Sequence, residues 1–141
     1  MLLDRARPDA ADVAARAAGA PSAARDALFA AINAQRTDRG LAAFLADPAL
    51  DDMAQSWAGT MALTGTMTHG DFPGRITQFY PNSAAGEDIA EGAIDVPAVV
   101  DLWMGSLPHR AKILGDFNHM GVGIARSVGG DTFFVLDFDN H

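Results

Sequence analysis

The last twenty or so residues carry the pattern that most constrains the fold, two strand-like segments joined by a short turn. Residues 120–126 alternate apolar and small or polar side chains, and residues 132–138 are rich in strand-forming residues. The turn between them contains Gly129 and Gly130. Period-two alternation is typical of β-strands, and a short glycine-containing turn joins antiparallel neighbours. The sequence therefore predicts a β-hairpin at this end.

The clearest helix of the chain is predicted before the hairpin, after Asp47 and up to Gly65. Asp47 can cap its start, Pro48 suits its first turn, and glycine is the usual residue just past a helix end. Apolar residues recur at helical spacing on a single stripe. They are Leu50, Met53, Ala54, Trp57 and Met61. This stripe is expected to pack against the sheet, and Trp57 and Trp103 are both expected to lie in the core.

Further helices complete one domain. One is expected over residues 22–39, capped by Ser22, and another begins at Asp95 and is interrupted by Pro108. Residues 1–21 are interpreted as an N-terminal arm, either flexible or a short helix, and residues 22–141 as the domain. A length of 141 residues suits a single hydrophobic core. Helices first and a hairpin last predict an α+β fold whose sheet is covered by helices.

The charge balance and the cysteine count exclude several classes of protein. Ten basic residues stand against 18 acidic ones, a net charge of -8, which disfavours nucleic acid and anionic membrane surfaces as partners. No apolar segment is long enough to span a bilayer, and no signal peptide is visible, so export would need another route or a signal already removed. Without cysteine there is no disulfide, thiolate metal site or cysteine nucleophile.

Residues 66–94 are interrupted by glycine and proline and are expected to be mainly loop, which in a compact domain is usual where the loop is functional. His69 and Glu87 lie within them, and His109 follows at a helix start. Two imidazoles and a carboxylate can bind a divalent metal ion or act in acid–base catalysis. The ordinary alternative is two solvated histidines and a glutamate paired with Arg75 or Arg110.

Several short segments occur in an order that is specific as a set. They are Asn33-Ala34-Gln35-Arg36, Asp47-Pro48-Ala49-Leu50, Gly86-Glu87-Asp88-Ile89-Ala90, Trp103-Met104-Gly105-Ser106-Leu107-Pro108-His109-Arg110-Ala111-Lys112-Ile113-Leu114 and Gly121-Val122-Gly123-Ile124. Over residues 26–138 this set resembles the CAP superfamily, in its small bacterial, cysteine-free form. The superfamily comprises the cysteine-rich secretory proteins, antigen 5 and the pathogenesis-related-1 proteins, also called SCP-like domains.

The resemblance implies an α-β-α sandwich with a central antiparallel sheet flanked by helices. It also implies a cleft formed by His69, Glu87, Ser106 and His109, in which His69 and His109 bind Zn²⁺ or another divalent cation. Binding is expected to be weak, because Ser106 stands where eukaryotic members have a second glutamate. The family further implies a secreted bacterial protein, periplasmic or extracellular, whose partner is a small molecule or a component of the cell envelope.

Asp88 departs from the family signature, which has asparagine at this position. It places a second negative charge next to Glu87 in the sequence. Such a charge would favour a nearby cation, or raise the pKa of a carboxyl group through like-charge repulsion.

Two other functions remain open. Ser106, His109 and Glu87 could form a serine hydrolase, or the histidines could hold a metal-activated water, with peptides or envelope material as substrate. The chain lacks the Gly-x-Ser-x-Gly elbow of many serine hydrolases. The family resemblance also leaves open the binding of a sterol or fatty acid. His119 and His141 match no family site position and are expected to be exposed.

Overall fold

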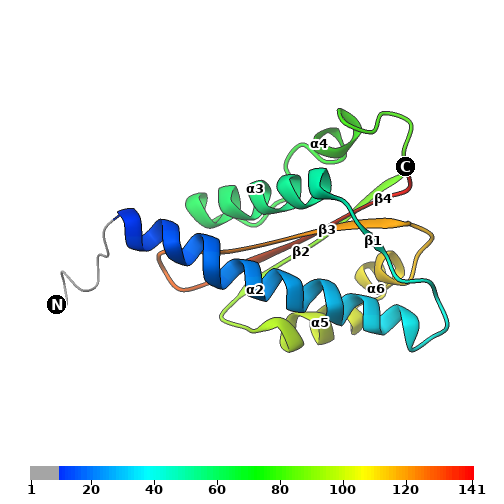
Figure 1. The fold of residues 1–141 in the computed structure, drawn as a ribbon, viewed down its shortest axis with the longest axis horizontal. Helices are drawn as coiled ribbons and strands as arrows, with labels where there is room; N and C mark the ends of the chain where they lie inside the picture. Colours follow the sequence, from blue (N-terminus) through cyan, green and yellow to red (C-terminus); the bar gives the residue numbers. More distant parts are fainter. Residues whose placement is uncertain (1–9) are drawn as a thin grey trace.

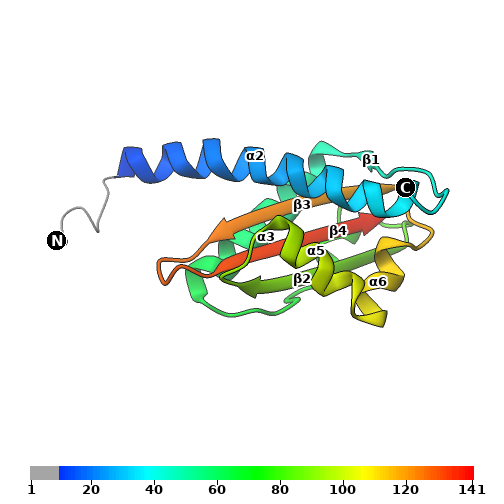
Figure 2. The same cartoon turned by 90° about the horizontal axis from the view of Figure 1, so that it is seen from below.

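A four-stranded sheet lies between two layers of helices in the computed structural model, which describes residues 10–141 and the side chains from residue 22 onward (Figure 1). The helices are α2 (Ala10–Thr37), α3 (Pro48–Thr64), α4 (Gly74–Thr77), α5 (Val96–Met104) and α6 (Leu107–Ile113). The strands are β1 (Leu45–Ala46), β2 (Ala85–Gly92), β3 (His119–Arg126) and β4 (Thr132–Asp139). Helices α3 and α4 cover one face of the sheet, and α2, α5 and α6 cover the other (Figures 1 and 2).

The strand order is β1-β3-β4-β2, so β2 lies at one edge of the sheet. The predicted hairpin is confirmed, because β3 and β4 pair antiparallel with Gly129 and Gly130 in the turn between them. Strand β2 also pairs antiparallel with β4. The two-residue β1 pairs parallel with β3, so the sheet is mixed where an antiparallel one was expected. The predicted α+β sandwich is otherwise confirmed.

Local signals fix the ends of α3 as predicted. The Asp47 side chain accepts a hydrogen bond from the backbone N–H of Ala49, and Gly65 adopts the left-handed conformation (φ 69°) that ends the helix. Close packing on β3 then depends on Gly121 and Gly123. A Cβ atom at either position would lie 2.2 Å from backbone atoms of α3. These two glycines therefore set how near α3 comes to the sheet.

The first helix differs from its prediction. Helix α2 is helical from Ala10, so Ser22 lies inside it and does not cap its start. Residues 1–9, part of the predicted arm, lie outside the described residues, and the division into an arm and a domain stays a prediction. The interruption predicted at Pro108 falls two to three residues earlier, at Gly105 and Ser106, and Pro108 lies in the first turn of α6.

The largest departure from the prediction is β2, which was expected to be loop. It pairs with β4 over its full length, from Ala85 to Gly92. Its middle carries the acidic pair Glu87 and Asp88, which conceals the apolar alternation of a buried strand. Alternation nevertheless places Glu87 and Ile89 on the α3 face and Asp88 on the opposite face.

The core lies on both faces of the sheet. Trp103 is fully buried on the face covered by α2 and α5, and its indole N–H donates to the Ile89 carbonyl, as expected of a core tryptophan. Trp57 is only partly buried, and its indole N–H donates to the Thr68 carbonyl in the loop after α3. Trp57 therefore packs against the border of the core on the α3 face, as a partly buried residue rather than the core residue that was predicted, because its ring also covers a polar site. None of the described helices combines the length and the apolar character that spanning a bilayer requires.

Candidate functional site

The candidate site is built on Glu87 at the sheet edge. Its side chain is fully buried, and the loop after α3 brings His69 against it, with Nδ1 of His69 2.8 Å from Oε1 of Glu87. Arg75, on α4, donates from Nη2 to both carboxylate oxygens, at 2.9 and 2.7 Å. An ionised carboxylate only accepts hydrogen bonds, so Nδ1 of His69 donates to Glu87, and in the neutral ring the lone pair is on Nε2.

Arg75 contacts most of the residues around Glu87. Its guanidinium lies 4.5 Å from the centre of the Trp57 ring, a cation–π contact. Nη2 also donates to the His69 carbonyl at 2.8 Å, and Nη1 lies 3.6 Å from Oδ2 of Asp137. Arg75 thus ties α4, the His69 loop and two strands together. Of the two partners that the sequence suggested for Glu87, Arg75 is the one found.

Asp137 is a site residue that the sequence analysis missed. It lies on β4, directly opposite Glu87 in the register, and its side chain is fully buried. Burial raises the pKa of Asp137 well above its usual range, Glu87 raises it further, and Arg75 lowers it. The only signal in the sequence was an aspartate within an apolar strand, where an acid is costly unless it is paired.

His109 enters from the first turn of α6, near the outer edge of β2. Its Nδ1 lies 2.8 Å from Oγ of Ser106. Burial lowers the pKa of His109, and the positive charges of Lys112 and of a protonated His69 lower it further. His109 is therefore neutral at pH 7 and keeps a lone pair for a ligand or a metal ion.

The structure assembles the predicted residues as two pairs. Glu87 hydrogen-bonds His69, and Ser106 hydrogen-bonds His109. Ligand atoms of His69, Glu87 and His109 do not all come within 4.8 Å of one another in the part of the chain that is described. The histidine of a serine hydrolase triad is oriented by an acid, and here the acid orients His69 while His109 faces the serine.

Asp88 lies on the opposite face of the sheet from Glu87, fully buried, with the Nζ of Lys112 3.4 Å from its carboxylate. Its pKa is raised to about 7, chiefly by burial and to a lesser degree by Glu87, while Lys112 lowers it. The like-charge effect expected from the sequence thus has the right direction but is secondary to burial.

Asp88→Asn is expected to remove a pH-dependent loss of stability. A carboxyl group whose pKa is raised by folding destabilises the fold as pH rises from its unfolded value to its folded one, here from about 4 to about 7. The free energy of unfolding of the wild type, relative to the variant, should fall by about 2 kcal/mol between pH 5 and pH 7. Urea unfolding at several pH values measures this difference, and a difference that does not change with pH would contradict it.

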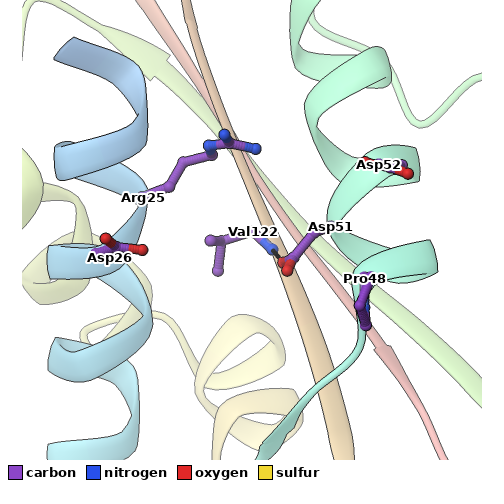
Figure 3. Close-up of a pocket in the computed structure, with 6 residues that line it drawn as sticks. All are labelled: Arg25, Asp26, Pro48, Asp51, Asp52 and Val122. Carbon is purple, nitrogen blue, oxygen red and sulfur yellow. Dashed lines mark hydrogen bonds between the residues drawn. The ribbon is translucent and has the colours of Figure 1, made fainter. Parts of the chain in front are cut away.

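Two hollows flank α3. One, of about 370 Å³, lies between α3 and α4 and borders the site through Trp57 and Arg75. The other, of about 270 Å³, lies between α2, α3 and β3. Figure 3 shows Arg25 of α2 and Asp51 of α3 on its two sides. Neither hollow is lined by His69 or His109.

The other two histidines were expected to be exposed, which holds for His141, whereas His119 is half-buried. The rings of His119 and His141 stack with centres 4.0 Å apart, beside the buried Asp139. The His119 side chain is 17% exposed and that of His141 is 30% exposed. No pattern in the sequence indicated this cluster, because its members meet only through the strand register.

A family model identifies the family of the chain. The profile of the cysteine-rich secretory protein (CAP) family matches residues 29–138. An uncharacterized membrane protein of Bacillus subtilis strain 168, YlbC, is 46% identical over 43 residues, which cover 30% of this chain and 12% of that protein.

Solved structures show the same fold. An outer surface protein of Borrelia burgdorferi has a TM-score of 0.75 and 23% identity, over 82% of this chain and 91% of that one. An extracellular SCP-domain protein of Bacillus anthracis (TM-score 0.74, 22% identity) matches over 86% of this chain. A cysteine-rich secretory protein of Staphylococcus aureus (TM-score 0.74, 20% identity) matches over 88%. The match spans 41% and 40% of the last two proteins.

Proposed function

The chain belongs to the cysteine-rich secretory protein (CAP) family, and from that premise we propose that it acts outside the cytoplasm as a ligand-binding domain. The ligand is a small molecule or a component of the cell envelope, and His69 and His109 contact it at the β2 edge. The outer-surface and extracellular descriptions of two structural neighbours support this location.

The contact between His69 and Glu87 carries the proposal. A fully buried carboxylate, fixed by Arg75, holds one nitrogen of an imidazole whose side chain is 51% exposed. The other nitrogen is thereby presented to solvent in a single tautomer. A half-exposed histidine can adopt several side-chain conformations in solvent. Fixing one of them with a buried Glu87–Arg75 pair is expected where the histidine binds a ligand.

A weakly held divalent cation is part of the proposal. The donor set fits one, because His69 offers an oriented Nε2 and His109 is neutral at pH 7. Glu87 already accepts from Arg75 and His69, so its role is to orient His69. Two imidazole ligands leave several coordination positions open to water or to an oxygen of the ligand, which accounts for weak binding.

The contacts favour binding over hydrolysis. A serine hydrolase needs the acid behind the histidine that faces the serine, and Glu87 contacts the other histidine. The hollow between α3 and α4 adds an apolar surface, from Met53, Trp57 and Phe79, beside the site. A ligand with both polar and apolar parts would suit this arrangement.

His69→Ala/His109→Ala is the variant that tests the proposal. Titration calorimetry with Zn²⁺ should show a binding event in the wild type that the double variant lacks, and co-sedimentation with purified bacterial cell-wall fragments should fall at least several-fold. His119→Gln/His141→Gln is the matched control, since it removes two histidines elsewhere and should retain the binding event that His69→Ala/His109→Ala lacks, together with the co-sedimentation. Identical isotherms and identical sedimentation for wild type and His69→Ala/His109→Ala would reject the proposal.

A further inference from the structure

We infer that His119, Asp139 and His141 form a second divalent metal site, of the kind that takes Zn²⁺. One ligand atom from each of the three residues lies within 4.8 Å of the other two. Nδ1 of His141 is 2.7 Å from both oxygens of Asp139, and Nδ1 of His119 is 3.8 Å from Oδ1. The site is distinct from His69 and His109.

The sheet itself places these residues. His119 begins β3 and Asp139 ends β4, and the two are direct partners in the antiparallel register, so their side chains lie on the same face. His141 follows Asp139 by two residues, which returns its side chain to that face. Two of the three ligands therefore lie on paired strands, which hold them near each other before any ion binds.

Asp139 is a buried carboxylate, which requires a cationic partner. Its side chain is fully buried, and the ion pairs found for it are with the two histidines. A buried carboxylate is costly without a cationic partner. A divalent ion coordinated by both imidazoles and the carboxylate supplies that charge.

An outer layer of residues orients the outermost ligand. The Tyr80 ring stacks on His141, with centres 3.8 Å apart and planes 5° apart, and the Tyr80 hydroxyl donates to Oδ2 of Asp47 at 2.7 Å. That same oxygen lies 3.9 Å from Nε2 of His141. With Nδ1 bound to a metal, Nε2–H would point to the Asp47 carboxylate, the usual support for a ligating histidine.

The donor set selects the class of ion. Two imidazole nitrogens and one carboxylate oxygen suit Zn²⁺ and related transition ions, while Ca²⁺ and Mg²⁺ prefer oxygen ligands alone. Bonds of about 2.0 Å put tetrahedral ligands about 3.3 Å apart, so the cluster closes slightly on binding. On binding, the His119 ring turns out of its stack on His141 and exchanges its contact with Oδ1 of Asn118, now 2.8 Å, for the ion.

The test uses tag-free protein carrying His69→Ala/His109→Ala, so that the site of the proposed function cannot contribute. We expect one equivalent of Co²⁺ to give visible absorption bands in this background, and Zn²⁺ to displace it. Adding His141→Gln should weaken binding at least about 10-fold, and Asp47→Asn about 10-fold. Asparagine caps a helix as well as aspartate does, so the Asp47 variant keeps the start of α3.

Glu91→Gln is the control, because it removes a carboxylate from an exposed position on β2 and should leave binding unchanged. Circular dichroism verifies that each variant is folded. Absence of Co²⁺ binding in the His69→Ala/His109→Ala background would overturn the inference, and so would binding that His141→Gln leaves unaltered. Either result leaves the proposed function of His69 and His109 standing, because that site is absent from the protein tested.

Discussion

Gly123→Ala is expected to destabilise the domain by about 3 kcal/mol, the upper end of the usual cost of overpacking. The added Cβ would lie 2.2 Å from the Ala54 carbonyl oxygen and 2.3 Å from its carbon. Both are main-chain atoms in the middle of α3, so no side-chain rotation can relieve the contact. The helix would have to move away from β3, which opens the core on that face.

Gly59→Ala provides the matched control, since it makes the same chemical change within α3. Nothing lies within 4 Å of the Cβ that it would add. Alanine is favoured over glycine inside a helix, so this variant should be more stable than the wild type by about 0.5–1 kcal/mol. Urea unfolding of both variants gives the comparison. A Gly123→Ala protein as stable as the wild type would show that α3 is not held by this close approach.

The elements that the sequence predicted are those with local signals. Asp47 and Gly65 mark the ends of α3 through their own side-chain and backbone chemistry, and the β3–β4 hairpin is a contact between neighbours in sequence. His69, Glu87, Ser106 and His109 were singled out from residue type and family resemblance. The structure shows which of them touch, a question that depends on the register of β2 against β4.

The features that were missed depend on long-range pairing. Strand β2 has no apolar alternation because Glu87 and Asp88 occupy buried positions, and each is tolerated only through a partner from another element, Arg75 or Lys112. Asp137 can be recognised as a site residue only once the register places it opposite Glu87. The local sequence shows acidic residues, which are costly to bury, but it does not show the distant cation that offsets this cost. Such a strand is therefore predicted to be a loop.

Arg75→Met is expected to cost about 3–5 kcal/mol at pH 7, the larger of the two effects. Glu87 and Asp137 have fully buried side chains and share this one guanidinium. Removing one partner of a buried ion pair leaves an uncompensated charge, and this cost exceeds the net contribution of the intact pair. Met retains most of the side-chain volume, so the loss reports on charge and hydrogen bonds. The His69 carbonyl also loses its donor, so Zn²⁺ binding at His69 should weaken in the same variant.

The pH dependence separates this electrostatic effect from a packing defect. Arg75 lowers the pKa of Asp137, so without it that carboxyl group takes up a proton more readily in the folded state. A carboxyl group whose pKa is raised in the folded state lowers the free energy of unfolding at high pH, and this effect disappears once the group is protonated in both the folded and the unfolded state. The loss of stability in Arg75→Met should therefore become smaller as pH falls toward 4. Arg110→Met makes the same substitution at an exposed position on α6 and should stay within about 0.5 kcal/mol of the wild type. Chemical unfolding at pH 4.5, 6 and 7.5 measures all three proteins, and a deficit that stays constant with pH would mean that Arg75 acts by filling space rather than by neutralising the two acids.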